Sequence, residues 1–469
     1  MTRSLMQAAD KQSMHRILQN FSRFGDKPAM VWRGRTYTYQ WLCRRISELK
    51  KTIDDHGIEN GAPVLIETDF SPAGVALFFA LAHKNCMLIP VGPQHQSGKD
   101  RLAEIAQAEY RTAPANRQTA NSQSDAGGVL VETTGRTASH RLYDILHESS
   151  HPGLVLFSSG TTGDPKGIVH DLALLAEPFA VPRKPFRAIA FLLFDHIGGI
   201  NTMLYILSSG GCLITVPDRQ PDTVLKAVEK HRAELLPASP TFLNMLLASE
   251  SYRQYDLGSL KVISYGAEPM PQSTLHRIHE LFPETRLQQT YGLSEVGILK
   301  TKSKSSDSLW LKAGGEGFET RIVDGILHIR AQTAMLGYLN APSPFTEDGW
   351  LDTGDAVEAE GEYIRFLGRE DEVINVGGEK VRPTEVEAVL EEMPELQQAV
   401  VFGEKNPLTG AIVAARVVPA ATAPPEAAEL RKKIRQYCEK RLPRYKVPVR
   451  IQITDAIQHT TRFKKQRQK

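Results

Sequence analysis

Short apolar runs separated by amphipathic segments recur along much of the chain. The run PVLIE at residues 63–67 predicts a buried strand, residues 73–82 predict a helix, and CMLIPV at residues 86–91 predicts a second buried strand. The same rhythm returns in LVLF from residue 154, in CLITV at residues 212–216, and in KVISY before the helix-like PQSTLHRIHELF. Strands and helices that alternate in this way are typical of an α/β protein with parallel sheets.

Three segments depart from this rhythm. Residues 111–128, RTAPANRQTANSQSDAGG, contain almost no large apolar side chain, which predicts a surface connection. Residues 421–429, ATAPPEAAE, predict a second loop. Residues 188–216 are the most apolar region, but Asp195 and His196 interrupt it before the roughly 20 apolar residues that a bilayer span requires. We therefore expect a buried core segment there and no membrane span.

Composition narrows the possible classes of protein. A chain of 469 residues predicts two or three domains, each large enough to fold without disulfides or a structural metal. The formal net charge of +2 gives no field that would recruit nucleic acid or a membrane surface, so we expect neither as a partner. The cysteines form no Cys-x-x-Cys pair, which argues against a disulfide framework or a zinc site: Cys43, Cys86, Cys212 and Cys438. Because the first ten residues also lack a signal-peptide pattern, we expect a cytoplasmic protein.

The densest candidate chemistry lies in residues 158–167, SSGTTGDPKG, directly after the strand-like LVLF. These ten residues contain three glycines, four hydroxyl side chains and Lys166. The backbone amides and hydroxyls of such a loop can bind a polyphosphate, whereas a plain surface turn does not need so many donors. The loop is not a Walker loop, because Pro165 and Gly167 stand where that motif requires glycine and a hydroxyl residue. A P-loop ATPase is therefore disfavoured.

Two other familiar signatures are incomplete. Residues 292–296, GLSEV, lack the last glycine of a Gly-x-Ser-x-Gly nucleophile elbow. Gly315, Glu316 and Gly317 are not followed by the third glycine of a dinucleotide-binding loop. The sequence thus supports neither a serine hydrolase nor a Rossmann dehydrogenase.

With four further segments, this loop closely resembles the adenylate-forming superfamily of acyl-CoA synthetases, adenylation domains and luciferases. The segments follow in the order of the family: YGAEP at 265–269, QTYGLSEVG at 289–297, GWLDTGD at 349–355 and LGREDEVINVGGEKVRPTEVE at 367–387. The resemblance implies an α/β fold with a large N-terminal ATP- and acid-binding region, residues 1–368, built from parallel and mixed sheets flanked by helices. A small, mobile C-terminal α+β lid, residues 369–469, would follow a hinge near Asp371.

The resemblance also implies which residues contact the phosphates of ATP. Thr161, Thr162 and Lys166 would bind phosphate oxygens, with Thr162 and Lys166 on the β- and γ-phosphates. Thr290 and Glu295 would lie near the α-phosphate and Mg²⁺. One carboxylate is enough for that metal, because Mg²⁺ takes few oxygen ligands from a protein.

The remaining nucleotide contacts involve adenine and ribose. By resemblance, Tyr291 would stack on adenine. Asp355 would accept from the ribose hydroxyls as a double acceptor, and Arg369 would donate to them. The edge of the base would face the backbone of three consecutive residues, Gly266, Ala267 and Glu268.

The tail HTTRFKKQRQK, from His459, resembles the family segment that carries a catalytic lysine, which makes Lys464 the candidate. Lys464 would bridge the substrate carboxylate and the α-phosphate oxygens. Phe463 stands at the usual glycine position and Gln458 at the usual proline position, so a solvated basic tail remains an alternative.

The segment FDHIGG, residues 194–199, aligns with the family in two registers that imply different acids. Asp195 resembles the aspartate by which amino-acid adenylation domains bind an α-ammonium group. His196, followed by Ile-Gly-Gly, resembles the gate residue of acyl- and aryl-acid ligases, with Asp195 available to orient it. We favour His196, because the string GGEKVRP also resembles acyl and aryl ligases.

The resemblance implies a second step in which the lid rotates and a pantetheine thiol attacks the adenylate. Gly377 and Gly378 would border the thiol tunnel, since glycine lets the pantetheine arm pass close to the backbone. We expect an acid:CoA ligase, with a freestanding enzyme that loads an acyl, aryl or amino acid onto a separate carrier protein as the alternative. The chain ends soon after Lys464, so we expect such a carrier to act in trans through its phosphopantetheine. A luciferase-like oxygenase or an inactive nucleotide binder is less favoured.

Overall fold

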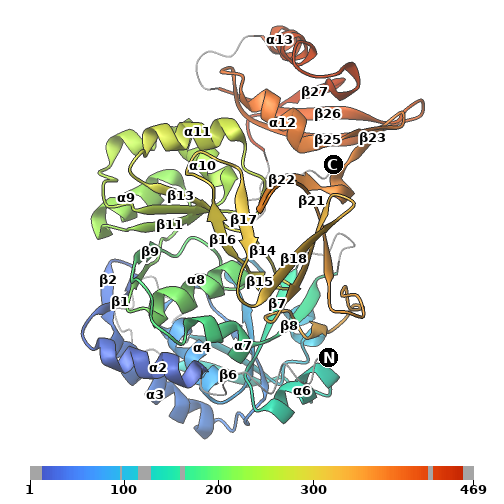
Figure 1. The fold of residues 1–469 in the computed structure, drawn as a ribbon. Coiled ribbons are helices and arrows are strands. Elements are labelled where there is room, and N and C mark those ends of the chain that lie inside the picture. Colours follow the sequence, from blue (N-terminus) through green and yellow to red (C-terminus); the bar gives the residue numbers. More distant parts are fainter. Residues whose placement is uncertain (1–12, 96–97, 115–127, 159–163, 421–425, 458–469) are drawn as a thin grey trace.

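The computed structural model describes residues 13–95, 98–114, 128–158, 164–420 and 426–457. Figure 1 shows a large body that carries most of the chain and, above it, a smaller C-terminal sheet flanked by α12 and α13. Within the described ranges, no helix is long and apolar enough to cross a membrane. The α/β fold class predicted from the sequence is confirmed, with large sheets and helices followed by a small C-terminal domain.

One seven-stranded sheet has the order β13-β12-β11-β9-β10-β1-β2. All neighbouring strands in it are parallel except β1 and β2. Its strands are β1 (Pro28–Trp32), β2 (Arg35–Thr38), β9 (Arg187–Ile189), β10 (Cys212–Ile214), β11 (Leu235–Ala238), β12 (Val262–Tyr265) and β13 (Arg286–Gln289).

A second seven-stranded sheet is mixed and has the order β20-β8-β7-β4-β3-β5-β6. The strands β3, β4, β5 and β7 run parallel, and the outer strands pair antiparallel. Its members are β3 (Pro63–Glu67), β4 (Met87–Val91), β5 (Tyr110–Pro114), β6 (Val129–Thr133), β7 (Gly153–Ser158), β8 (Lys166–Asp171) and β20 (Gly337–Tyr338).

Two antiparallel arrangements follow along the chain. A two-stranded ribbon pairs β14 (Gly292–Leu293) with β15 (Gly297–Ile298). A six-stranded sheet has the order β16-β17-β22-β21-β19-β18. Its strands are β16 (Lys300–Ser303), β17 (Leu311–Gly314), β18 (Phe318–Val323), β19 (Ile326–Ala331), β21 (Leu351–Glu360) and β22 (Tyr363–Arg369).

The C-terminal sheet has its own hydrophobic core, which includes Ile374, Val401 and Ile434. Its strands are β23 (Ile374–Val376), β24 (Glu379–Val381), β25 (Leu396–Asn406), β26 (Gly410–Pro419) and β27 (Arg450–Ile453), with α12 (Pro383–Glu391) and α13 (Ala427–Glu439). This region touches the large body where α12 contacts α11 and β22, and where β25 contacts α10.

The remaining helices flank the two large sheets or lie between them. They are α2 (Ser13–Phe24), α3 (Tyr39–Asp55), α4 (Pro72–His83), α5 (Lys99–Ile105), α6 (Arg141–Ser149), α7 (Leu172–Ala176), α8 (Ile197–Ser208), α9 (Pro221–His231), α10 (Pro240–Ser249) and α11 (Gln272–Leu281). Short 3₁₀ turns are η1 (Pro93–His95), η2 (Glu177–Phe179), η3 (Ser251–Gln254), η4 (Glu370–Glu372) and η5 (Arg444–Lys446).

The predicted strand–helix–strand unit is present as β3, α4 and β4, with the two strands parallel. The side chain of Ser71 caps α4 by accepting from Gly74, and Pro72 occupies its first turn. Nearly every residue of α4 is buried, as expected of a helix that is apolar on all sides. It packs in one core with Leu154 of β7 and Leu213 of β10, so it joins the two large sheets.

Two predicted loops are partly wrong. The start of 111–128 belongs to β5, which pairs antiparallel with β6. Small residues suffice at this side of the sheet, where the buried hydroxyl of Thr112 donates to the Leu65 carbonyl at 3.1 Å. The end of 421–429 belongs to α13, because alanine and glutamate favour a helix once the prolines have passed.

Candidate active site

Two loops at the carboxyl ends of β12 and β13 lie side by side. The strands are parallel neighbours with Tyr265 opposite Gln289, so both loops leave the sheet at the same edge. The backbone N–H of Thr290 (2.7 Å) and its hydroxyl (3.1 Å) both donate to the Tyr265 carbonyl. A Cβ on Gly266 would lie 2.5 Å from the Thr290 carbonyl oxygen, so this approach requires glycine. The structure thus brings Gly266 and Thr290 together.

The next two residues of the first loop are held in place by the backbone and by α10. Ala267 has a left-handed φ of 72°, which is uncommon for a residue other than glycine. The Oε1 atom of Glu268 accepts a hydrogen bond from the backbone N–H of Thr241 (3.1 Å), in the first turn of α10. A helix N-terminus favours a carboxylate. The side chain of Glu268 therefore anchors the loop to α10. The backbone of Glu268, and not its side chain, is the part predicted to lie beside adenine.

Tyr291 and Asp355 come from distant segments and meet directly. The Tyr291 hydroxyl donates to Oδ2 of Asp355 at 2.6 Å. Burial first, and then the Asp355 charge, raise the pKa of Tyr291, so its phenol stays protonated and donates. The Tyr291 ring is stacked on Phe366, with centroids 4.3 Å apart. A purine can therefore stack only on the opposite face of Tyr291.

Arg369 lies across the β21–β22 pairing from Asp355. Its Nη1 lies 3.7 Å from Oδ1 of Asp355 and donates to the Thr353 carbonyl at 3.0 Å. Its Nε and Nη2 donate to the two carboxylate oxygens of Asp371, at 3.1 and 3.2 Å. The predicted ribose pair is thus assembled, and the predicted hinge residue Asp371 is tied to it.

Lys166 and Glu295 meet at Tyr338. The Tyr338 hydroxyl donates to Oε1 of Glu295 at 2.8 Å, and the Lys166 ammonium lies 5.2 Å from the centroid of the Tyr338 ring. Burial and the negative charge of Glu295 raise the pKa of Tyr338, so it remains a donor. Tyr338 therefore connects Lys166, at the end of the predicted phosphate-binding loop, to Glu295, the carboxylate predicted to bind Mg²⁺.

The segment around Tyr338 also contacts the residues that flank Lys166 and the backbone of Glu295. Asn340 accepts from the Gly167 backbone N–H at 3.0 Å and donates to the Pro165 carbonyl at 2.9 Å. The backbone N–H of Met335 donates to the Glu295 carbonyl at 2.7 Å. Sequence reasoning missed Tyr338 and Asn340, because their partners lie 43 and 173 residues away and no local pattern marks them.

The donor set near Glu295 fits a magnesium ion that arrives with a nucleotide. Tyr338 occupies Oε1, and Oε2 of Glu295 forms no hydrogen bond within the described part of the chain. Among the described residues, no group of three or more His, Cys, Asp or Glu side chains could hold a metal by itself. Mg²⁺ usually binds one or two carboxylates and completes its shell with phosphates and water.

Asp195 and His196 lie at the start of α8 and have different surroundings. Asp195 is buried, and its Oδ2 accepts from the Gly92 backbone (3.1 Å) and the Gln94 amide (2.7 Å), with Nε2 of His95 at 3.3 Å. His196 is the N-cap of α8, and its Nδ1 accepts from the Gly198 backbone N–H at 3.2 Å. The loop after β4 therefore supplies three partners to Oδ2 of Asp195, which the sequence did not reveal.

Gly377 and Gly378 form the turn between β23 and β24, with left-handed φ values of 63° and 97°. The backbone N–H of Gly377 donates to Thr409 (2.9 Å), and that of Gly378 donates to the Asn375 side chain (2.8 Å). A Cβ on Gly378 would meet no atom within 4 Å. Backbone conformation, and not crowding, is therefore what favours glycine here.

Three predicted residues lie outside the described part of the chain. They are Thr161 and Thr162 in the phosphate-type loop and Lys464 in the tail. Their roles stay predictions.

Comparison with known families gives two matches. Residues 18–339 match the AMP-binding enzyme family, and residues 385–464 match the AMP-binding enzyme C-terminal domain. Together they cover most of the chain and agree with the order of motifs found in the sequence.

Individual relatives agree with these matches. An indoleacetate–CoA ligase of Aromatoleum aromaticum is 26% identical over 92% of this chain and 92% of its own length. A 4-coumarate–CoA ligase of Arabidopsis thaliana is 25% identical over 86% of this chain and 82% of its own. The solved structure of the anthranilate CoA ligase AuaEII with anthranoyl-AMP has the same fold, with a TM-score of 0.79, 19% identity and coverage of 97% and 95%. The sequence-based prediction of an ATP-dependent, AMP-forming acid–thiol ligase is confirmed at this level, and the chain belongs to the AMP-binding, or adenylate-forming, enzyme family.

Proposed function

We propose that this chain converts an aromatic carboxylic acid to its CoA thioester through an acyl-adenylate. The observation that carries the proposal is the meeting of Lys166 and Glu295 at Tyr338. It joins a cation suited to terminal phosphates with a carboxylate suited to Mg²⁺, which is what ATP binding needs. Relatives named for indoleacetate and 4-coumarate favour an aromatic acid and CoA.

In the first half-reaction, an oxygen of the substrate carboxylate attacks the α-phosphorus of ATP, and the bond to pyrophosphate breaks. Thr161, Thr162 and Lys166 would hold the departing phosphates, and Thr290 would lie at the α-phosphate. Lys464 would bridge the substrate carboxylate and the α-phosphate oxygens and neutralise their negative charge. Positioning and charge neutralisation carry most of such a step, because phosphoryl transfer leaves little covalent work for the protein.

The adenosine would be held by two separate groups of residues. Adenine would lie between the free face of Tyr291 and the backbone of residues 266–268, and Asp355 with Arg369 would hold the ribose. Both ribose residues already have protein partners that fix their side chains. Preorganised donors and acceptors of this kind cost no rearrangement when the nucleotide binds.

Glu295 is the group that we assign to Mg²⁺, which would neutralise phosphate charge when it is bound. Its Oε2 is the available oxygen, because Oε1 is held by Tyr338. Tyr338 thereby acts as a positioning residue that orients the carboxylate.

In the second half-reaction, the thiol sulfur of CoA attacks the acyl carbon and AMP leaves. We assign residues 1–368 to the ATP- and acid-binding region and residues 369–469 to the lid, with Asp371 as the hinge. Gly377 and Gly378 would border the path of the pantetheine arm. The reaction would take place in the cytoplasm, where ATP and CoA are both present.

His196 is our candidate for the residue beside the acid. Oδ2 of the buried Asp195 carboxylate already has Gly92, Gln94 and His95 as partners, so this oxygen is engaged within the protein. This supports an acid without an α-amino group.

The test is acid-dependent exchange of labelled pyrophosphate into ATP, measured with indole-3-acetate, 4-coumarate, a fatty acid and a set of amino acids. We expect exchange with the aromatic acids and thioester formation when CoA is added. Exchange with amino acids alone would overturn the choice of acid. Accumulation of the adenylate until a carrier protein is supplied would overturn CoA as the acceptor.

A further inference from the structure

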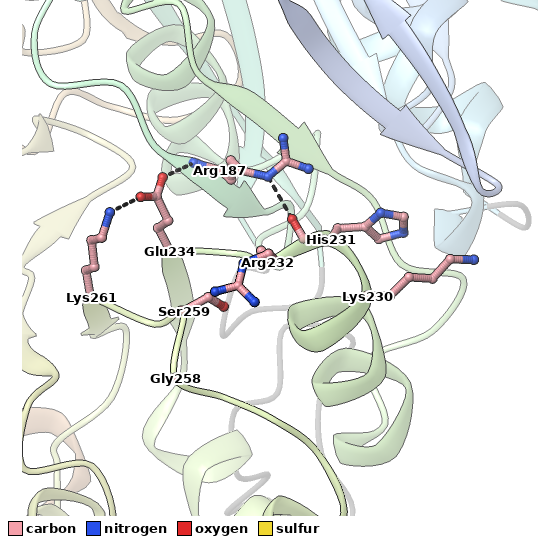
Figure 2. A pocket seen from close by; sticks show the side chains of 8 residues that line it. All are labelled: Arg187, Lys230, His231, Arg232, Glu234, Gly258, Ser259 and Lys261. Atoms are coloured by element: carbon pink, nitrogen blue, oxygen red, sulfur yellow. Dashed lines mark hydrogen bonds and ion pairs between the residues drawn. The ribbon is translucent and has the colours of Figure 1, made fainter.

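A cavity of about 610 Å³ lies at the edge of the first seven-stranded sheet that is opposite the predicted nucleotide loops. Arg187 is the first residue of β9, Glu234 comes directly before β11, and Lys261 comes directly before β12. These are the amino ends of parallel strands, whereas the predicted nucleotide loops follow their carboxyl ends. Figure 2 shows these side chains beside Lys230, His231 and Arg232, which lie at the end of α9.

Positive charge dominates this cavity. Four of its lining side chains are cationic, and Glu234 is the one carboxylate among them: Arg187, Lys230, Arg232 and Lys261. The cavity therefore has a formal charge of +3, although the whole chain has only +2. A concave site of one sign concentrates the electrostatic field and attracts ions of the opposite sign.

Internal pairing neutralises only part of this charge. Glu234 accepts hydrogen bonds from Lys261 and from the Arg187 backbone N–H. The Nε of Arg187 donates to the His231 carbonyl at 2.7 Å, which holds its guanidinium in the cavity. Within the described part of the chain, the side chains of Lys230 and Arg232 form no hydrogen bond or ion pair. Partial burial, and then the charges of Lys230 and Arg187, lower the pKa of His231, so both charges act on this imidazole.

Helix stabilisation explains only some of these residues. Basic side chains at the carboxyl end of a helix complement its dipole, which accounts for Lys230, His231 and Arg232. Arg187 and Lys261 come from two other segments, where Arg187 bonds to the His231 carbonyl and Lys261 pairs with Glu234. Glu234 is the one carboxylate among four cations, so the lining keeps an excess of positive charge that an anionic ligand would offset.

We propose that this cavity binds a small anion with at least two phosphate groups, at a site separate from the catalytic one. Its volume lies within the range of about 300–1,000 Å³ that is usual for small-molecule sites. The guanidinium of Arg187 and that of Arg232 each offer the planar donor pair that suits phosphate oxygens. The phosphates can come from inorganic polyphosphate or from a nucleotide bisphosphate, such as the one in CoA.

The test is calorimetric titration of the full chain with inorganic tripolyphosphate and, separately, with adenosine 3′,5′-bisphosphate. The double variant Lys230→Gln/Arg232→Gln removes two exposed charges from the cavity. We expect at least tenfold weaker binding of whichever compound the wild type binds here, with an unchanged melting temperature. Lys166→Ala, at the predicted ATP site, should leave this binding component in place.

A matched control removes two exposed charges elsewhere. Lys432→Gln/Lys433→Gln, on α13, changes the net charge equally and should alter the dissociation constant less than twofold. Tighter binding of tripolyphosphate would identify the ligand of the cavity as a free polyphosphate. Tighter binding of the bisphosphate would identify it as a nucleotide. Equal weakening by both double variants, or no binding of either compound that depends on Lys230 and Arg232, would overturn the proposal.

Discussion

The large body and the C-terminal region hold their predicted site residues in different ways. In the large body, residues from distant segments fix one another, as when Tyr291 bonds to Asp355 and Tyr338 bonds to Glu295. In the C-terminal region, the hydrogen bonds of Gly377 and Gly378 go to Thr409 and Asn375, close by in the same sheet or its connecting turn.

This difference has a functional consequence. Groups that are already fixed can stabilise charge in adenylation without rearrangement. Residues of the C-terminal region can contribute to a half-reaction only when that region lies close to the adenylate. Variants in the two regions should therefore separate the half-reactions, and the predictions below test that separation.

The largest effect is expected for Lys464→Ala. Loss of a positioned electrostatic donor costs about 3–4 kcal/mol, or about 10²- to 10³-fold in rate. Pyrophosphate exchange should fall by that factor, while a supplied acyl-adenylate should still react with CoA. Lys465→Ala is the control and should retain exchange. The reverse result, a dead Lys465→Ala and an active Lys464→Ala, would show that our alignment of the tail is wrong by one residue.

Gly378→Leu should act on the opposite half-reaction. A left-handed conformation costs a residue with a Cβ about 1–2 kcal/mol, and the leucine side chain would also obstruct the pantetheine arm. We expect thioester formation to fall about 10²-fold, with pyrophosphate exchange within twofold of wild type. Gly361→Leu carries similar strain, with φ of 60° in the β21–β22 turn, and should leave both steps intact. Equal losses in both half-reactions of Gly378→Leu would contradict the separation.

Much of this picture was predictable because its signals are local. The strands at 63–67 and 86–91 are continuous apolar runs, and their structure follows from burial on both faces. Gly266 and Thr290 were both identified because each lies in a motif beside its own strand.

Contacts between distant segments left no such signal. Tyr338 and Asn340 lie on or just after a two-residue strand, and the pairing of β20 with β8 brings Tyr338 to Lys166 and Asn340 to Gly167. The partners of Asp195 after β4 were missed for the same reason. The cavity at the amino ends of β9, β11 and β12 was missed because its cations come from three separated segments.

Tyr338→Phe should produce a smaller loss that is confined to the large body. A hydrogen bond to a charged group contributes about 1.5–3 kcal/mol, so we expect about thirtyfold weaker binding of Mg²⁺–ATP. Calorimetric titration with Mg²⁺ and a non-hydrolysable ATP analogue measures this without turnover. Tyr363→Phe, on β22, is the control and should change affinity less than twofold. If Tyr338→Phe also changes affinity less than twofold, Tyr338 does not position Glu295.

The smallest effect is expected from pH acting on His170, beside the same site. His170 is fully buried, and burial lowers its pKa to about 4, although its Nε2 donates to the Ser294 carbonyl at 2.6 Å. The unfolded chain, with a histidine pKa of about 6.5, binds this proton more readily than the folded chain. The contribution to stability is therefore full above about pH 6.5 and is lost as pH falls toward 4, at about 1 kcal/mol per pH unit near pH 5.5. Urea unfolding of wild type and His170→Gln at pH 7, 6 and 5 isolates this slope, because the other titrating groups are shared. If the free energy of unfolding depends on pH in the same way in both proteins, His170 does not cause the loss of stability at low pH.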